Sequence, residues 1–511
     1  MNHRLTDKLE KLAFSAESIA ILSFVIYLLT LAPGVYGFDS AELATGVYSL
    51  GIVHPPGYPL YMLLGRLFLL LPFHSVAYKL NLMSATFATL TVFFVYKIVF
   101  KLYAKSWIAW ITSAFLAFSI YFWQMSVVAE VYTLHTFLLA CEIYILLQWR
   151  DKGDPRLLVL FAFVYGLSMT NHTSGLLFAP GFAWMIFSSP RWKWKIDWFW
   201  LAMIGSFLFA LLLYLYIPIR ANSSTPLNYL KEYYNVDVTT LSGLLWMISG
   251  KAYRFFAFGY SGLDIWRELV GGINLVWRCF MGVGFLLGFL GIIQFLRKNW
   301  KLSTALLLIF LGNFIFYINY RVLDKDTMFL PAFLVFSLFV GQGILTLDQL
   351  LEKAFCDLNK ASWQQRFHPL FWTGLVILSL ALNWQWTDMS QTLGPETYSN
   401  TILNSAAEGS TIIASWSPAV VLEYYQIVEG RRADLHIYNQ SRSQVARYYE
   451  YWAKGMSRSQ ISKAVISDEL EKVDEMYCSG VVYSIEYDPT VAKSYEYLPV
   501  GTFYQLNRKG N

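Results

Sequence analysis

The chain is poor in charge and in cysteine. Asp, Glu, Lys and Arg make up 14% of its 511 residues, whereas about 25% of a soluble globular protein is charged. The four cysteines form no CxxC pair and no Cys/His cluster. Neither a zinc site nor a disulfide framework is therefore indicated. The net charge of +5 gives no reason to expect nucleic-acid binding, because basic residues of a membrane protein mostly report its orientation.

Several sequence signatures are also missing. The chain contains neither GxGxxG nor GxxxxGK[ST], so no nucleotide site is visible. It shows no internal repeat and no low-complexity tract. A basic N-terminal stretch leads into an apolar segment without a small-residue cleavage site, which favours an uncleaved first helix over a signal peptide.

Apolar and aromatic residues are abundant, at 56% and 18% of the chain, and they predict an all-α polytopic membrane protein. A membrane-spanning helix needs about 20 apolar residues. The apolar segment 60–72 is shorter and contains Arg66, so we expect an interfacial or re-entrant helix there. Eleven segments are candidate spans: 15–34, 80–100, 106–122, 126–148, 157–172, 174–189, 197–219, 271–296, 302–319, 327–347 and 369–386.

The segments that connect these spans differ in their number of basic residues, depending on the side of the membrane. With the N-terminus placed in the cytoplasm, every cytoplasmic segment carries three Lys or Arg, eighteen in all, against nine on the outer side. This bias predicts the orientation, because Lys and Arg collect in cytoplasmic loops. With eleven spans, the C-terminal segment lies outside.

That segment is polar and alternates short strand-like and helix-like patterns. Strands are expected at 411–416, 434–439, 481–487 and 501–506, and helices at 420–430 and 441–475. The pattern predicts a small α/β domain on the outer face. We therefore expect a transmembrane domain at 1–387 and an extracytoplasmic domain at 388–511.

The unusual polar residues gather on the predicted outer side. Ionisable groups near membrane depth are costly and mark functional sites by default. The candidate site residues are Asp39, Glu42, His54, Tyr58, Glu130, His172, Arg220, Lys251, Arg254, Asp324 and Asp326.

Structural interpretations compete with the functional one. Asp39 and Glu42 in DSAE fit a capping box, with Asp39 as N-cap and Glu42 at N3. HPPGYP fits a rigid turn, and Arg220 fits an interfacial anchor. Glu130 is harder to explain structurally, since a carboxylate in an apolar span needs a partner.

A lipid-phosphate substrate suits acids and bases at the outer leaflet. Arg220, Lys251 and Arg254 are suited to binding its phosphate. If the head group is a sugar, its transfer to a hydroxyl needs a carboxylate that takes the proton and cations at the leaving phosphate. A phosphate leaving group requires no general acid.

Five blocks in order resemble the GT-C glycosyltransferases, membrane enzymes that use polyprenyl-phosphate sugars. The match is closer to a family of bacterial and animal proteins, once known only as a domain of unknown function, whose animal members include a transmembrane protein O-mannosyltransferase. The resemblance covers about residues 15–350, and the C-terminal segment resembles the family only loosely. The blocks are FDSAEL…LGIVHPPGYPLY, VVAEVYTL, TNHT, YLYIPIRA and NYRVLDKDTMFLP.

The resemblance implies a GT-C fold and Asp39 as the catalytic carboxylate, with Glu42 as its neighbour or helper. Many O-mannosyltransferases of the superfamily have adjacent Asp-Glu, whereas here the two acids are three residues apart. This departure leaves open which carboxylate is the base.

We therefore predict an inverting glycosyltransferase of a bacterial inner membrane. The donor is a polyprenyl-phosphate hexose such as mannose, and the acceptor is a Ser/Thr hydroxyl of a secreted protein or a lipid or glycan hydroxyl. No cofactor is expected, although Glu130, Asp324 and Asp326 offer oxygen ligands to a divalent metal. The alternatives are a lipid or sugar transporter or flippase, which predicts repeats and midplane polar groups, and a non-catalytic scaffold.

Overall fold

A computed structural model describes residues 13–192, 198–322, 324–356 and 361–510, with the backbone alone at 354–356 and 361–369. Several basic residues used for the predicted orientation, among them Arg4, Lys8, Lys193 and Lys360, lie outside the described residues. The chain forms two compact units, each built from three stretches of sequence. The first contains residues up to 31, 82–214 and 256–389, and the second contains 32–81, 215–255 and 390–511.

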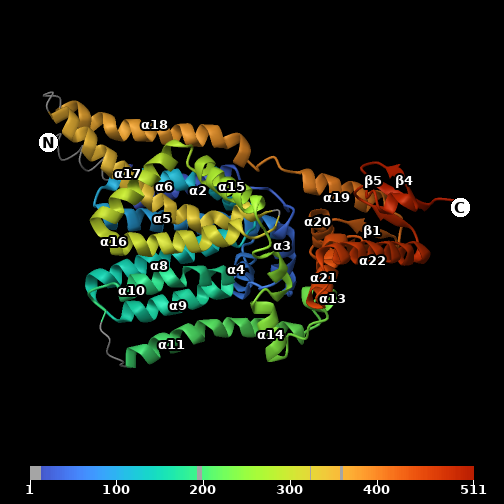
Figure 1. Cartoon of the computed structure of the whole chain (residues 1–511). Helices are drawn as coiled ribbons and strands as arrows, with labels where there is room; N and C mark the ends of the chain where they lie inside the picture. The colour runs from blue at the N-terminus through green and yellow to red at the C-terminus, as the bar shows by residue number, and fades with distance from the viewer. Residues whose placement is uncertain (1–12, 193–197, 323, 357–360, 511) are drawn as a thin grey trace. The chain divides into compact units, whose positions relative to one another are not determined.

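The first unit is helical, as the sequence predicts. In Figure 1, α8, α9 and α10 run side by side. Its helices are α2 (Ala16–Leu29), most of α5 (Val76–Tyr103), α6 (Ser106–Ala117), α7 (Ile120–Ser126), α8 (Tyr132–Lys152), α9 (Arg156–Asn171), α10 (Ala179–Phe187), α11 (Trp198–Leu211), α15 (Leu263–Cys279), α16 (Val283–Ile318), α17 (Leu330–Cys356) and α18 (Ala361–Thr387), with 3₁₀ turns η1 (Thr173–Phe178), η2 (Leu212–Leu215, partly in the second unit) and η4 (Lys325–Phe329).

Among the described residues, four helices are long and apolar enough to cross a membrane. They are α5, the stretch Trp198–Ala221, α16, and the stretch Lys325–Lys353. The pair α6 and α7 adds a fifth if its 71° bend belongs to one span. Shorter apolar helices cover other predicted spans, such as Ala16–Leu29 and Arg156–Asn171. The membrane class is confirmed, whereas the count of eleven spans is not.

The structure corrects one predicted span and explains one predicted break. The predicted span 271–296 is interrupted, since α15 ends at Cys279 and α16 begins at Val283. The predicted break at 297–301 is present as a bend, because Asn299 leaves the helical region of backbone space inside α16 (φ −147°, ψ 67°). Two helical segments meet there, close to the positions that the sequence predicts.

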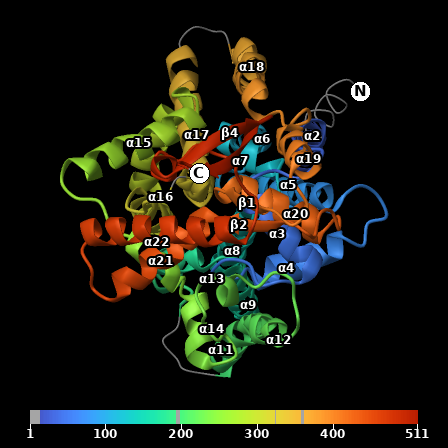
Figure 2. The ribbon, with the colours of Figure 1, turned by 90° about the vertical axis from the view of Figure 1, so that its right-hand side faces the viewer.

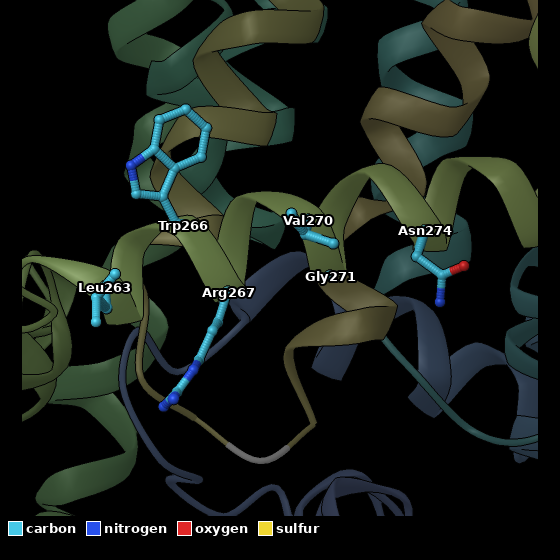
Figure 3. A pocket seen from close by; sticks show the side chains of 6 residues that line it. All are labelled: Leu263, Trp266, Arg267, Val270, Gly271 and Asn274. Atoms are coloured by element: carbon cyan, nitrogen blue, oxygen red, sulfur yellow. The ribbon is translucent and has the colours of Figure 1, made fainter.

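Helix α15 carries an exposed apolar stripe. Leu263, Trp266, Val270, Ile273 and Trp277 recur at helical spacing and are all exposed, with Trp266 at 65%. Figure 3 shows the shallow pocket along this helix, where Arg267 and Asn274 add polar groups. Such a stripe, with Trp and a basic residue, is typical of a helix that contacts lipid.

The second unit combines two loop regions with the C-terminal segment. Its helices are α3 (Asp39–Ser49), α4 (Pro59–Phe68), α12 (Tyr216–Ala221), α13 (Tyr229–Tyr233), α14 (Leu241–Ile248), α19 (Gly394–Ser405), α20 (Trp416–Ile427), α21 (Gln440–Ala453) and α22 (Arg458–Ser479), with 3₁₀ turns η3 (Lys251–Phe256, whose last residue belongs to the first unit) and η5 (Val491–Lys493). Helix α4 begins at Pro59, one residue before the predicted short helix 60–72, and ends earlier, at Phe68.

The C-terminal segment is α/β, as predicted. Its five-stranded sheet has the order β2-β1-β3-β5-β4, from β1 (Thr411–Ala414), β2 (His436–Asn439), β3 (Val482–Ser484), β4 (Tyr495–Val500) and β5 (Phe503–Arg508). Strands β2 and β3 are parallel to β1, whereas β5 is antiparallel to both β3 and β4. Strand β4 was not predicted. The predicted helix 441–475 is two helices, α21 and α22, separated by a turn with Gly455.

This segment packs on the loop regions of its own unit. Figure 2 shows α20 beside α3 and α13 beside α21, and both pairs are in contact. A parallel bridge joins Ile52 to Asn228 and ties the first loop region to the second. The division into domains at 387/388 stays a prediction, but the compact unit already includes 32–81 and 215–255.

Candidate active site

Helix α3 begins with two carboxylates in its first turn. Its N-cap is Phe38, which has a positive φ of 58° and gives no side-chain cap, so Asp39 is the first helical residue. The capping-box interpretation is therefore wrong, because Glu42 accepts hydrogen bonds from His54 and not from the N-cap. Negative charge is favourable at this end of a helix.

The HPPGYP segment is a buried turn that positions two side chains. Gly57 adopts φ +90° and donates its N–H to the His54 carbonyl at 2.9 Å. A Cβ atom at Gly57 would lie 2.9 Å from Met247 Cε and 3.0 Å from Ile217 Cδ1. Both atoms are the ends of flexible side chains that can shift, so it is the positive φ that favours glycine here. The turn brings the Tyr58 hydroxyl within 2.7 Å of His54 Nε2.

His54 links the two acids of α3. Its backbone N–H donates to Glu42 Oε1 at 2.8 Å, and its Nδ1 lies 2.9 Å from Glu42 Oε2. The same Nδ1 is 3.8 Å from Asp39 Oδ1. All three residues are buried, with exposures of 9% for Asp39, 1% for Glu42 and 9% for His54.

A guanidinium from the C-terminal segment completes the cluster. Arg442 Nη2 lies 2.7 Å from Glu42 Oε2, and Arg442 Nη1 lies 3.2 Å from Glu423 Oε2. The guanidinium carbon is 5.1 Å from the ring centre of Tyr229 and 5.8 Å from that of Tyr233, within the range of cation–π contacts. Arg442 stands in the first turn of α21, and its backbone N–H donates to the N-cap Asn439 at 3.2 Å.

The cluster sets the charges of its members. Burial alone would raise the pKa of Glu42, but Arg442 and His54 lower that pKa to about 2. Burial opposes the protonation of His54, but the charges of Asp39 and Glu42 raise its pKa to about 9. Burial raises the pKa of Glu423 to about 7, although Arg442 opposes that shift. At neutral pH Glu42 is therefore ionised and His54 is protonated.

The two acids differ in what their carboxylates can do. The Glu42 side chain is 1% exposed and is held by Arg442 and His54, whereas the Asp39 side chain is 12% exposed. An acceptor hydroxyl needs a carboxylate within hydrogen-bond reach. Exposure therefore favours Asp39 as the group that takes a proton, with Glu42 holding His54 in place.

The same three residues could hold a divalent metal. One ligand atom each from Asp39, Glu42 and His54 lies within 4.8 Å of the others, and no other such group occurs among the described residues. A histidine must be neutral to bind a metal, but His54 Nδ1 is engaged by Glu42. Arg442 already supplies a positive charge at Glu42. The donor set is thus better suited to an organic ion-pair network than to a metal.

The predicted phosphate-binding cations have different environments. Arg220 Nε donates to the Leu50 carbonyl at 2.7 Å and its Nη2 donates to the Ser49 carbonyl at 3.3 Å, so this guanidinium holds the C-terminal end of α3. Lys251 and Arg254 in η3 are exposed, and their cationic groups are accessible to an anionic head group. Binding of phosphate by these three residues stays a prediction.

Four predicted site residues lie in the other compact unit. Glu130 is buried, and its backbone N–H donates to Ser84 Oγ at 3.1 Å. His172 Nδ1 accepts from the Ser174 N–H at 3.2 Å. The structure shows a local role for the backbone of Glu130 and for His172; for them and for Asp324 and Asp326, participation in the site remains a prediction.

Sequence reasoning missed Arg442, Glu423 and Tyr229. One local signal was present for Arg442, because it shares a helical stripe with Ala446 and Tyr449 at spacings of four and seven. An arginine in the inward stripe of a helix needs a buried partner. That partner, Glu42, lies 400 residues earlier in the chain. Nothing in the sequence around Arg442 indicates which residue it pairs with.

Comparison with known proteins gives matches in sequence and in fold. Residues 39–195 match the family model of the N-terminal domain of protein O-mannosyl-transferase TMEM260. The mouse protein O-mannosyl-transferase TMEM260 is 30% identical over 252 residues, which are 48% of this chain and 35% of the relative. The Dictyostelium discoideum protein of that name is 25% identical over 476 residues, 81% of this chain and 55% of the relative. The chain thus spans about a third to a half of these relatives.

The fold matches solved structures of ArnT from Cupriavidus metallidurans. The structure bound to undecaprenyl phosphate gives a TM-score of 0.56 with 11% identity over 96% of each chain, and the apo structure gives 0.54 with 10% identity over the same shares. At this identity the similarity shows the fold alone. The chain therefore has the fold of the ArnT structures, and in sequence it resembles the TMEM260 protein O-mannosyl-transferases, as the sequence motifs predict.

Proposed function

We propose that this protein transfers a hexose, mannose in the simplest case, from a polyprenyl-phosphate carrier to a hydroxyl group. The preferred acceptor is a Ser or Thr side chain of a secreted protein. The observation that carries the proposal is the partly exposed Asp39 carboxylate beside the Glu42–His54–Arg442 network, inside the stretch that matches the O-mannosyl-transferase model.

In the proposed reaction, Asp39 accepts the proton of the acceptor hydroxyl. The hydroxyl oxygen forms a bond to the anomeric carbon while the bond from that carbon to the phosphate oxygen breaks. The electron pair of the broken bond leaves with the polyprenyl phosphate. Because the hydroxyl attacks in one step from the face opposite the leaving phosphate, the configuration at the anomeric carbon inverts. No metal or other cofactor is needed for these steps.

Other residues of the second unit have separate roles in this reaction. His54, protonated and 3.8 Å from Asp39, stabilises negative charge at the base. Lys251 and Arg254 stabilise the charge that develops on the leaving phosphate. Tyr58 holds His54 through the 2.7 Å contact at Nε2.

Two findings support this assignment. The curated relatives are named protein O-mannosyl-transferases, and one fold neighbour was solved with undecaprenyl phosphate. The distribution of basic residues further supports an orientation with a cytoplasmic N-terminus and the 388–511 segment outside; a bacterial inner membrane is part of the proposal.

The test is sugar transfer by the purified full chain from polyprenyl-phosphate mannose to a Ser/Thr-containing peptide, alongside other lipid-linked sugars. We expect transfer by the wild type and a loss of about 10²–10⁴ in kcat for Asp39→Asn, the range for a general base. Wild-type turnover by Asp39→Asn would show that another group is the base. A folded wild type that transfers none of the sugars would favour a flippase or a scaffold.

A further inference from the structure

We propose that Arg442 is a positioning residue of the transfer reaction. Through its contacts with Glu42 and Glu423 it holds Glu42, and with Glu42 the His54 ring, in place beside Asp39. The C-terminal α/β segment thus completes the active site in addition to any contact that it makes with the acceptor. This inference rests on the proposed function.

The geometry of Arg442 is that of a bridge between elements. Its two terminal nitrogens contact carboxylates from two helices, Glu42 of α3 at 2.7 Å and Glu423 of α20 at 3.2 Å. The residue itself is 4% exposed and comes from a third helix, α21. A planar guanidinium with fixed donors suits such a bridge, whereas a lysine ammonium does not reproduce its geometry.

Aromatic rings of α13 and η3 lie against both the Arg442 guanidinium and the His54 ring. Tyr229 and Tyr233 of α13 lie against Arg442, and the Tyr229 ring centre is also 6.2 Å from that of His54. The Tyr229 hydroxyl lies 2.9 Å from the hydroxyl of Tyr253, whose ring centre is 6.4 Å from that of His54. Any change in the position of Arg442 therefore reaches the residues that surround His54.

The charges of the cluster depend on Arg442. Three carboxylates, those of Asp39, Glu42 and Glu423, face two cations, His54 and Arg442. Without Arg442, three buried acids would share one histidine, and a proton bound among them would be strongly favoured. The titratable groups that face this cluster are Asp39 and Glu42 from α3, His54 and Tyr58 from the turn, Tyr229, Glu232 and Tyr233 from α13, Tyr253 from η3, Glu423 from α20 and Arg442 from α21.

The consequence for catalysis has a defined direction. If the acids of the cluster bind a proton more strongly, Asp39 is protonated up to a higher pH. Protonated Asp39 cannot act as a base until it loses that proton. Removing Arg442 should therefore move the acidic limb of the kcat profile to higher pH and lower kcat at neutral pH. The Michaelis constant for the donor should change little, because the Arg442 side chain is only 4% exposed and is engaged by Glu42 and Glu423.

The experiment compares Arg442→Gln and Arg442→Lys with Arg447→Gln in the full chain, using mannose transfer from polyprenyl-phosphate mannose. Arg447 lies on the same helix, and its side chain pairs with Asp468 at 3.9 Å, so it is a matched control. We expect Arg442→Gln to lower kcat about tenfold to a hundredfold, the equivalent of one charge-assisted hydrogen bond. The acidic limb should rise by about one pH unit. Arg442→Lys should recover part of both losses, and Arg447→Gln should match the wild type.

A double variant tests whether Arg442 acts through Glu42. We expect Arg442→Gln to cost much less in a Glu42→Gln background, because the partner is already neutral. Additive losses, or a folded Arg442→Gln with wild-type kcat and pH profile, would overturn the inference. If both Arg442 variants fail to fold, the residue is structural and the inference also fails. A wild type that transfers no sugar counts instead against the proposed function.

Discussion

Helices α3 and α21 both carry charged residues in their first turns, two acids in α3 and one arginine in α21, and these residues lie in one cluster. Asp39 and Glu42 of α3 stand in a stretch rich in motifs, inside the region matched by the family model. Arg442 of α21 stands outside that region, in a polar helix without any motif. The comparison teaches that a dense local motif reveals one half of a site, while the other half is set by contacts between distant segments.

The largest expected effect tests whether the two helices depend on each other. Glu42→Leu leaves the buried Arg442 without its 2.7 Å partner, and breaking such a pair costs about 3–5 kcal/mol in the free energy of unfolding. Glu450→Gln removes an exposed pair with Lys454 on α21 and should cost less than about 0.5 kcal/mol. Denaturation in detergent measures both. Equal effects would mean that α3 and α21 are energetically independent.

The second effect is a pH dependence of stability. The pKa of His54 is raised from 6.5 to about 9, so its stabilisation is complete below pH 6.5 and is lost as the pH rises through 9. The loss amounts to about 3 kcal/mol. Glu42 works in the opposite direction, because its pKa is lowered from 4.5 to about 2, and its contribution is lost as the pH falls from 4.5 towards 2.

Unfolding measured between pH 6 and pH 10 tests this for the wild type and for His54→Gln. The variant should lose less stability over that range than the wild type. A parallel decline of the two proteins would contradict the assigned charge of His54.

The third effect concerns the turn that joins α3 to α4. Gly57→Ala places a Cβ at φ +90° and requires the ends of two flexible side chains, Met247 and Ile217, to shift, so we expect a loss of about 2 kcal/mol in stability, most of it from the backbone. Gly430→Ala is the matched control, since its φ is +67° and no atom lies within 4 Å of the added Cβ. It should show only the smaller backbone cost of about 1 kcal/mol. Thermal unfolding compares them, and equal losses would mean that the turn is loosely packed.

The smallest effect concerns the exposed cations of η3. Lys251→Gln and Arg254→Gln should each raise the Michaelis constant for the lipid-phosphate donor a few-fold, with a larger increase at low salt, because exposed charges are screened. Steady-state kinetics at two salt concentrations measure this. An unchanged Michaelis constant in the double variant would remove η3 from the donor site.

The sequence predicted the fold class and the α/β character of the C-terminal segment, because membrane-length apolar runs and alternating patterns are local signals. It also placed Asp39, Glu42, His54 and Tyr58 among the candidate site residues, and the turn that follows α3 brings these four together. It did not predict that Phe38 is the N-cap of α3, because a positive φ at a phenylalanine follows from tertiary contacts such as the Phe38 N–H to Ser417 hydrogen bond. The pairing of Glu42 with Arg442 was equally invisible, since it depends on the packing of α20 and α21 against α3 and α13.

The central claim is that Asp39 is the base of a sugar transfer. Because Asp39 is the first helical residue and not the N-cap, Asp39→Asn changes charge at constant shape. It removes a helix-terminus interaction of about 0.3–1 kcal/mol and the interaction with protonated His54 at 3.8 Å, so the folded fraction of the variant has to be matched to that of the wild type. The decisive measurement is the single-turnover rate of mannose transfer from polyprenyl-phosphate mannose by Asp39→Asn and by the wild type, at equal folded fractions. We expect the rate to be lower by about 10²–10⁴ in the variant. Equal rates would contradict it.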